Sequence, residues 1–141
     1  MVLLGSSAFV ARAQTAVTLA GSPSMVVSSA IAGAQPTPVT NTSSTYLLTG
    51  TPAIFTGLKV RAKLLTSLPS GVTVTVSAAV GPLNSSSGSV TLTTSYQDIL
   101  TSQLPSNNAY TLTYTLSATT AASPTLQNVS VQYCVNSSNN C

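Results

Sequence analysis

Strict alternation of apolar and polar residues marks residues 109–119 as a β-strand with one buried face. Threonine and serine occupy every second position, and the positions between them are apolar. These apolar positions are Tyr110, Leu112, Tyr114, Leu116 and Ala118. Successive side chains of a strand point to opposite faces, so the segment presents one continuous apolar face. A second layer has to cover that face, and the chain must therefore supply a facing sheet.

Similar segments recur along the chain at intervals typical of an all-β sandwich. Turns rich in proline, glycine, serine and asparagine separate them. The expected strands are 45–49, 53–65, 71–79, 89–94, 109–119 and 126–135. Residues 96–100 are expected to form a short helical turn or a bend, because Asp98 can cap locally. We therefore predict an all-β fold, a single antiparallel β-sandwich of the Ig-like or jelly-roll type.

The alternation also assigns the two faces of the expected strands. The inward positions are Leu58, Val60, Ala62 and Leu64 in one strand, Val72, Val74 and Val76 in the next, and Val129, Val131 and Tyr133 in the last. Lys59, Arg61 and Lys63 point outward and make the only positive cluster. Charges on an exposed strand oppose unwanted edge pairing, which is the interpretation we favour. The alternative is that they hold a sulfated or acidic glycan, or the carbonyl groups of a neighbour.

Residues 1–35 are predicted to form an apolar arm that precedes the sandwich body at 36–141. The arm consists of a strand at about 8–20 and a hinge at 21–35, with a short strand candidate at 25–27, and the prolines at 36 and 38 mark its end. One face of the arm strand carries Phe9, Ala11, Ala13, Thr15, Val17 and Leu19. A transmembrane helix needs about 20 apolar residues, and glycines at 5 and 21 interrupt this run, so no membrane span is expected.

Residues 1–13 resemble the second half of a secretory signal. A short apolar run ends in Ala11-Arg12-Ala13, which has the form of a cleavage site before Gln14. A basic region before the apolar run is missing, which favours retention of the segment. Both alternatives stay open, and cleavage would shorten the arm face to Thr15, Val17 and Leu19.

The charge content is very low for a chain of 141 residues. The only charged side chains are Arg12, Lys59, Arg61, Lys63 and Asp98, and the chain has no histidine and no tryptophan. Such a surface points to a secreted, extracellular protein, and low charge suits a protein that assembles. A surface that binds nucleic acid needs many more cations than the four in this chain, so we expect no nucleic-acid partner.

The chain also lacks the residue sets that common catalytic sites require. A catalytic triad needs an imidazole, a glycosidase needs two carboxylates, and a hydrolytic metal site needs several histidine, cysteine or carboxylate ligands. We therefore expect neither an enzyme nor a cofactor.

Cysteines, sequons and tyrosines supply the remaining candidate sites. Cys134 and Cys141 enclose six residues and are predicted to form a disulfide loop. The loop restricts the unfolded chain and so stabilises the folded state by about 2 to 3 kcal/mol.

The candidate N-glycosylation sites are Asn41, Asn84, Asn128 and Asn136. Asn128 lies in an expected strand, and the others lie in loops or the tail. The five tyrosines could form a sugar platform, but alternation places Tyr110 and Tyr114 in the core or at its rim.

An apolar strand-like arm, a proline-marked hinge and a sandwich with almost no surface charge resemble the layout of donor-strand-exchange filament subunits. These are the β-sandwich pili and threads of archaea and the chaperone-usher pilins of bacteria. The chain departs from the bacterial pilins in its cysteine pair, and from type IV pilins in lacking their long N-terminal helix.

The resemblance implies a structural subunit of an extracellular, cell-surface filament that polymerises head-to-tail with identical subunits. The donor residues would then be Phe9, Ala11, Ala13, Thr15, Val17 and Leu19, inserted between strands of the next subunit. Surface glycans or other cells are further expected partners. Two alternatives are a secreted monomeric β-sandwich module for carbohydrate binding or adhesion, and a virion or surface-layer structural protein.

Overall fold

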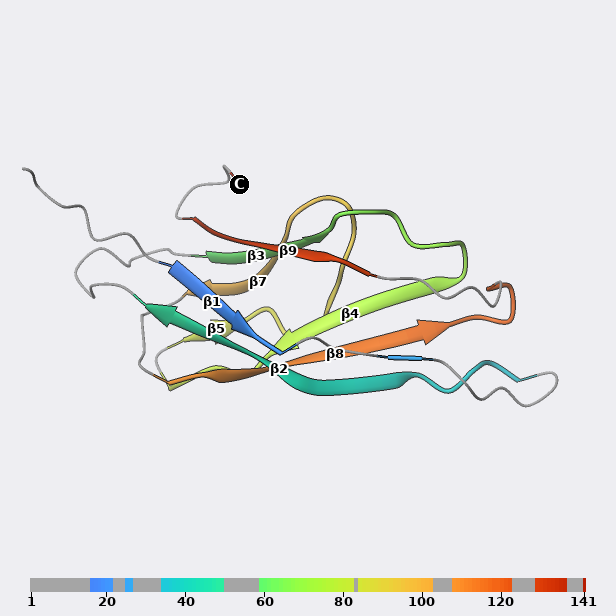
Figure 1. Ribbon diagram of the computed structural model, residues 1–141, viewed down its shortest axis with the longest axis horizontal. Coiled ribbons are helices and arrows are strands. Elements are labelled where there is room, and N and C mark those ends of the chain that lie inside the picture. Colours follow the sequence, from blue (N-terminus) through green and yellow to red (C-terminus); the bar gives the residue numbers. More distant parts are fainter. Residues whose placement is uncertain are drawn as a thin grey trace, which may run out of the picture.

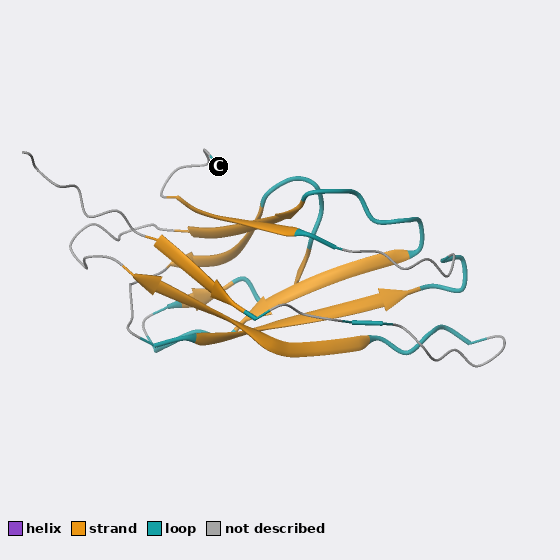
Figure 2. Ribbon diagram, in the orientation of Figure 1, coloured by secondary structure: helices purple, strands orange, loops and turns teal. Residues whose placement is uncertain are grey.

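The chain folds into two facing antiparallel β-sheets, which confirms the predicted sandwich (Figures 1 and 2). The computed structural model describes residues 16–21, 25–26, 34–49, 59–82, 84–102, 108–122, 129–136 and 141. Within these residues every regular element is a strand, and no helix occurs. Alternating sequences that bury one face per strand therefore produce the expected two layers.

Nine strands are found among the described residues, and they make up the two sheets. They are β1 (Ala16–Ala20), β2 (Val39–Thr49), β3 (Lys59–Leu64), β4 (Val72–Ala78), β5 (Ser85–Ser86), β6 (Val90–Thr91), β7 (Gln97–Ser102), β8 (Tyr110–Ala118) and β9 (Val131–Asn136). The order in the first sheet, sheet A, is β1-β2-β8-β4-β6, and the order in sheet B is β5-β7-β3-β9. Strands β8 and β3 therefore have a neighbour on each side.

Strand β8 is the centre of sheet A and follows the predicted alternation. It pairs with β2 on one side and with β4 on the other. Leu112 and Tyr114 are buried, and Tyr110 and Leu116 pack against the core from its rim. The prediction that Tyr110 and Tyr114 lie in the core or at its rim is therefore confirmed.

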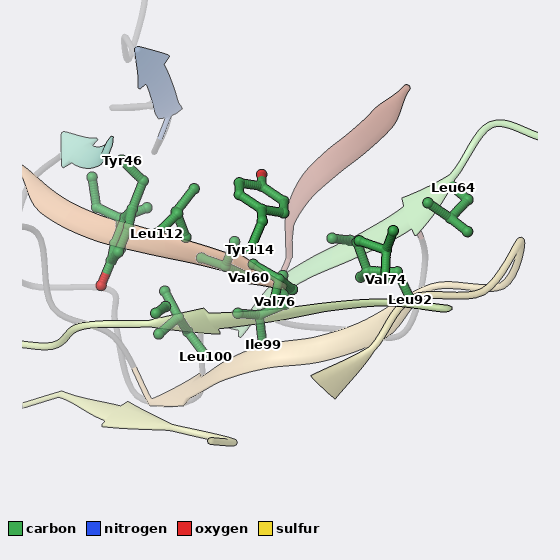
Figure 3. Packing of buried hydrophobic residues seen from close by; sticks show 13 residues of the cluster. Tyr46, Val60, Leu64, Val74, Val76, Leu92, Ile99, Leu100, Leu112 and Tyr114 are labelled. Atoms are coloured by element: carbon green, nitrogen blue, oxygen red, sulfur yellow. The ribbon is translucent and has the colours of Figure 1, made fainter. Parts of the chain in front are cut away.

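The core lies between the sheets and is built almost entirely of aliphatic and tyrosine side chains (Figure 3). Sheet B contributes Val60, Ala62, Leu64, Ile99 and Leu100, and sheet A contributes Tyr46, Leu48, Val74, Val76, Ala78, Leu112 and Tyr114, with Leu92 following β6. The predicted inward positions of β3 and β4 are thus confirmed, except that Val72 is only partly buried. Leu58 lies outside the described residues.

The prediction of a short helical turn or a bend at 96–100 is wrong, because residues 97–102 form strand β7. The register with β3 passes from Val60 opposite Leu100 to Arg61 opposite Asp98, so one extra residue of β7 is accommodated by a bulge. Ile99 and Leu100 can then both be buried although they are consecutive. This bulge removes the period-two signal, which explains why the sequence pattern did not indicate a strand.

Three other segments differ from their expected bounds. Strand β2 begins at Val39 rather than at residue 45, and the expected strand at 25–27 is not formed at residues 25–26, the part of it that is described. Strand β9 begins at Val131, and Val129 is exposed rather than inward. The polar start of β2 has no apolar alternation, so pairing with β8 and not local pattern makes it a strand.

The expected strand at 89–94 instead crosses from one sheet to the other. Only Val90–Thr91 form strand β6 beside β4. The amide of Leu92 then donates to the carbonyl of Val74 in sheet A, and the amide of Leu64 in sheet B donates to the carbonyl of Thr93. This crossing ties the two sheets together along the β4 side of the sandwich.

Hydrogen bonds of tyrosine hydroxyls connect segments that are far apart in the sequence. The hydroxyl of Tyr46 donates to the carbonyl of Ala79 at 2.7 Å, just beyond β4. Tyr114 and Tyr133 meet through their hydroxyls, which links β8 of sheet A to β9 of sheet B. Burial raises the pKa of Tyr46 to about 12 and also raises the pKa of Tyr133, to which the nearby Tyr114 contributes.

Leu112→Ala should lower the free energy of unfolding by about 2 to 5 kcal/mol, because it leaves a cavity in the core. The neighbouring outward residue Thr113 supplies the control, since Thr113→Ala should change stability by no more than about 0.5 kcal/mol. Equilibrium unfolding in urea measures both variants. Equal losses in the two would contradict the assignment of the β8 faces.

Stability should fall as the pH rises from about 10 to about 12. Unfolded tyrosines release their protons near pH 10, whereas folded Tyr46 keeps its proton to about pH 12, so the unfolded state binds fewer protons in this range. Tyr46→Phe should be less stable near neutral pH by about 1 kcal/mol and should show a shallower alkaline loss. Urea unfolding at several pH values tests this, and an identical alkaline slope in both proteins would refute it.

Candidate functional site

The N-terminal strand β1 is an edge strand of the chain's own sheet. It pairs antiparallel with the last five residues of β2, from Ala16 opposite Thr49 to Ala20 opposite Thr45. It also touches β9 of sheet B, so it lies where the two open edges of the sandwich meet (Figure 1). For residues 16–20, the expectation of an arm that stands apart from the body is therefore wrong.

Strand β1 adds little buried surface to the core. Val17 faces inward opposite Leu48 and is partly buried, whereas Leu19 faces Tyr46 and remains 42% exposed. Burial of apolar surface contributes roughly 25 cal/mol per Å², so these half-covered side chains hold the strand less firmly than the central strands are held. Main-chain pairing with β2 is consequently a large part of what keeps β1 in place.

The other expected donor residues, Phe9, Ala11, Ala13 and Thr15, lie outside the described residues. Sequence reasoning did not foresee that Met25 packs against the core, although neither Met25 nor Val26 is part of a strand. Met25 and Val17 are an even number of residues apart, which is the spacing of one face of an extended chain. That spacing was the available signal, but the glycine and proline between them concealed it.

Gly21 ends β1 at a close approach to β2. Its φ is +83°, which glycine adopts readily and other residues do not, and a Cβ there would fall against the carbonyl oxygen of Ser43. Strand β1 therefore covers only the second half of β2. Among the described strands, none pairs with the Val39–Ser44 half of β2 on that side.

The predicted positive cluster lies on the outer face of sheet B, but on a central strand. Strand β3 is paired with β7 on one side and β9 on the other, so its charges do not protect an edge. The interpretation that we favoured from the sequence is therefore wrong for this strand. The outward direction of Lys59, Arg61 and Lys63 is confirmed by the burial of the residues between them.

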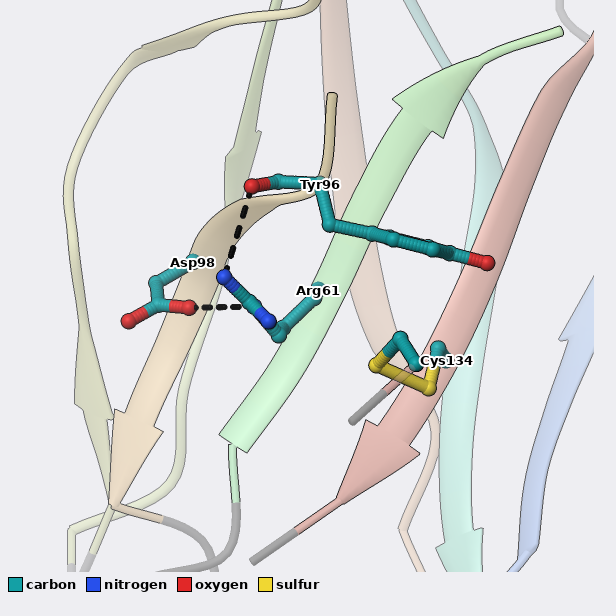
Figure 4. The surroundings of a disulfide bond; sticks show 5 residues. Arg61, Tyr96, Asp98 and Cys134 are labelled. Atoms are coloured by element: carbon teal, nitrogen blue, oxygen red, sulfur yellow. Dashed lines mark hydrogen bonds and ion pairs between the residues drawn. A yellow bond between two sulfur atoms is a disulfide. The ribbon is translucent and has the colours of Figure 1, made fainter. Parts of the chain in front are cut away.

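Asp98 on β7 holds two of the three cations, Lys59 and Arg61, and Figure 4 shows its contact with Arg61. Its Oδ2 lies 2.6 Å from the Lys59 Nζ, and its Oδ1 lies 2.7 Å from the Arg61 Nε. The Arg61 guanidinium also donates to the carbonyl oxygen of Tyr96 at 3.4 Å. The hydrogen bond from Lys59, together with the charges of Lys59 and Arg61, keeps the pKa of Asp98 below its ordinary value of 3.8.

The third cation contacts an aromatic ring instead. The Nζ of Lys63 lies 4.6 Å from the centre of the Tyr96 ring, within the range of a cation–π interaction. Figure 4 shows this ring lying across β3 on the same side of the sheet as Arg61. We call this surface, formed by Lys59, Arg61, Lys63, Tyr96 and Asp98, the charged face.

The predicted disulfide between Cys134 and Cys141 is formed, with Cα atoms 6.0 Å apart. Cys134 lies opposite Arg61 in the pairing of β9 with β3, so the disulfide borders the charged face (Figure 4). It attaches Cys141 to the edge strand of sheet B. The sequence indicated the pairing of the cysteines but not this location.

The structure places three of the four sequon asparagines. Asn41 lies within β2 and not in the expected loop, and its Oδ1 accepts from the backbone amide and the hydroxyl of Ser43 at 2.9 and 2.7 Å. Asn84 directly precedes β5 and is partly exposed, as expected of a loop site. Asn136 is the last residue of β9. Asn128 lies outside the described residues.

An open groove of about 310 Å³ lies at the far end of the sandwich from Thr49. It is bordered by the end of β3 and the beginning of β4, and its floor includes Leu64, Leu68 and Leu92. Threonines and a serine also line the groove, and none of the described residues that line it is charged. It offers a small apolar surface without a group for acid–base chemistry.

Searches of the described part of the chain find no cluster of three potential metal ligands and no helix long and apolar enough to cross a membrane. Comparison with models of protein families, with curated proteins and with solved structures finds no match. The candidate sites of the described part are thus the β1 edge and the charged face.

Asp98→Asn should lower the free energy of unfolding by about 1 kcal/mol at pH 7, because it removes the carboxylate that holds Lys59 and Arg61 and the pair is partly exposed. Since the folded pKa of Asp98 is lowered, its contribution is present above about pH 4 and is lost as the pH falls below that value. Urea unfolding at pH 7 and in acid should show the difference shrinking. Lys63→Gln, which leaves the Asp98 contacts in place, is the control.

Proposed function

We propose that this chain is a structural subunit of an extracellular filament in which β1 of one subunit takes the place of β1 in the next. The observation that supports this is the position of β1: an edge strand, half-covered, and joined to the body by a long connection. If each subunit inserts its β1 into the next subunit, every contact is head-to-tail. Such contacts do not form a closed ring, so they continue into a filament.

Exchange of an edge strand preserves the contacts of the closed form. The same five pairs with β2 and the same burial of Val17 form whether β1 comes from its own chain or from a neighbour. The balance between the two forms then depends on the connection and on the protein concentration. The 18-residue connection, residues 21–38, could reach roughly 60 Å when extended, which is ample to bridge two sandwiches.

The proposal differs in one respect from the expectation that the resemblance raised. The chain's own β1 already fills the edge of sheet A beside residues 45–49 of β2. We therefore expect that a subunit does not need a neighbour in order to fold. A closed monomer is then the stored form and the exchanged polymer is the assembled form. The open Val39–Ser44 half of β2 is where a longer donor would gain pairs that the closed form lacks.

The surface of the chain supports an extracellular, assembled protein. Its low charge removes the repulsion that keeps soluble proteins apart. The disulfide is of the kind that persists in oxidising compartments. A second candidate function is a secreted monomeric binding module, which is favoured by the closure of β1 on its own sheet and by the charged face.

A disulfide trap distinguishes exchange from closure. Ala20 and Thr45 face each other across β1 and β2, and opposed residues of antiparallel strands have Cα atoms roughly 4.5 to 5.5 Å apart, within disulfide range. The double variant Ala20→Cys/Thr45→Cys should therefore link the two strands wherever they pair. In the closed form the link stays within one chain, and in the exchanged form it joins two chains.

The full-length variant is concentrated until it assembles, oxidised, denatured and run on a non-reducing gel. A ladder of covalent multimers is expected, whereas linked monomer from assembled material would contradict exchange. Each single cysteine variant and the offset pair Thr18→Cys/Thr45→Cys are the controls, because random collisions would cross-link these variants as well. Deletion of residues 1–20 should leave a soluble, less stable protein that no longer assembles, and persistent assembly would overturn the proposal.

A further inference from the structure

Every charged side chain in the described part of the chain lies on one surface, the charged face. Three cations and one carboxylate leave it with a net charge of +2. The fifth charged residue, Arg12, lies outside the described residues. The exposed side chains elsewhere in the described part are uncharged: they are mostly polar, such as threonine and serine, with a few apolar ones such as Leu19 and Leu65. Positive potential is therefore concentrated on the outer face of sheet B.

The position of these charges in the fold rules out the usual structural explanation. Edge strands carry lysines to prevent pairing with other chains, but β3 already has a partner on both sides. The β1 edge, where such protection would act, has no charge along Ala16–Ala20. Edge protection therefore does not account for three cations on this central strand.

The geometry holds these cations in fixed positions. Asp98 fixes the Lys59 ammonium and the Arg61 guanidinium on its two oxygens, and the ring of Tyr96 lies under the Lys63 ammonium. Groups that are already ordered lose less conformational entropy when a ligand binds. Residues 59, 61 and 63 lie at every second position of a strand, so their stems are spaced about 6.5 to 7 Å apart along a line.

We propose that the charged face binds a linear acidic polysaccharide, with its sulfate or carboxylate groups lying along β3. A row of cations fits a repeating anion better than a single small one. A second copy of the chain cannot supply the anions, because its one acidic side chain, Asp98, already holds Lys59 and Arg61. Tyr96 contributes an aromatic ring beside the row, and the exposed Gln132, opposite Lys63 on β9, contributes an amide.

This site does not depend on strand exchange, although repetition along a filament would multiply a weak single contact into useful avidity. One site with a net charge of +2 should bind weakly and should lose affinity steeply with salt. The binding assay therefore uses the unassembled full-length chain, so that a failure of the filament proposal does not affect the result.

The test measures binding of fluorescent dextran sulfate and polygalacturonate, with neutral dextran as the uncharged control and single-stranded DNA as the competing polyanion. Lys63→Gln should lower affinity for an acidic polysaccharide about threefold to tenfold and reduce the salt slope by about one. The matched variant Lys63→Gln/Thr40→Lys restores the net charge but moves it to the exposed outer face of sheet A. Its affinity should stay as low as that of Lys63→Gln.

Thermal unfolding and circular dichroism verify that both variants keep the fold, as expected for substitutions at outward positions. Wild-type affinity in Lys63→Gln, or recovery of affinity in the double variant, would show that Lys63 and its location are not part of a site. Tighter binding of the DNA than of either acidic polysaccharide would assign the face to a different partner and overturn the proposal. Equal binding of neutral dextran would do the same.

Discussion

Burial of the apolar face of β8 beneath sheet B is the interaction on which the rest of this structure depends. Leu112 and Tyr114 are covered from the opposite layer, and the hydroxyls of Tyr114 and Tyr133 meet between the sheets. Because β8 is the central strand of sheet A, it also sets the register of β2 and β4. The remaining strands can then be understood by how they complete or leave open the two sheets around this contact.

The two sides of the sandwich are closed in different ways. Beside β4, the chain passes from sheet A to sheet B at residues 92–93. The amide of Leu92 donates to β4 of sheet A, and the carbonyl of Thr93 accepts from the amide of Leu64 in sheet B, so backbone hydrogen bonds join the two layers. On the opposite side, β1 lies between the open edges and is held by five pairs with β2 and by modest apolar burial. The second closure is the weaker one, since it uses a strand whose large side chains remain partly exposed. The weaker closure is therefore where we expect the proposed strand exchange, at β1.

The polar chemistry of the chain is separated from both closures. Charged side chains gather on the outer face of sheet B, where Asp98 and Tyr96 hold the cations. Figure 4 shows the contact of Asp98 with Arg61 and the disulfide beside it. The β1 edge carries no charge at all. Assembly through β1 and ligand binding on the charged face would thus use different surfaces, and one would not obstruct the other.

The sequence by itself determined the all-β class, the faces of β3, β4 and β8, and the cysteine pair, because period-two alternation and short cysteine spacing are local signals. Only the tertiary structure decided that 97–102 is a strand, since a bulge buries Ile99 and Leu100 in succession. It also decided that β3 is central, that Asp98 reaches Lys59 and Arg61, and that β1 pairs with its own β2. Which strands become neighbours depends on contacts between residues far apart in the chain, and no local pattern records them.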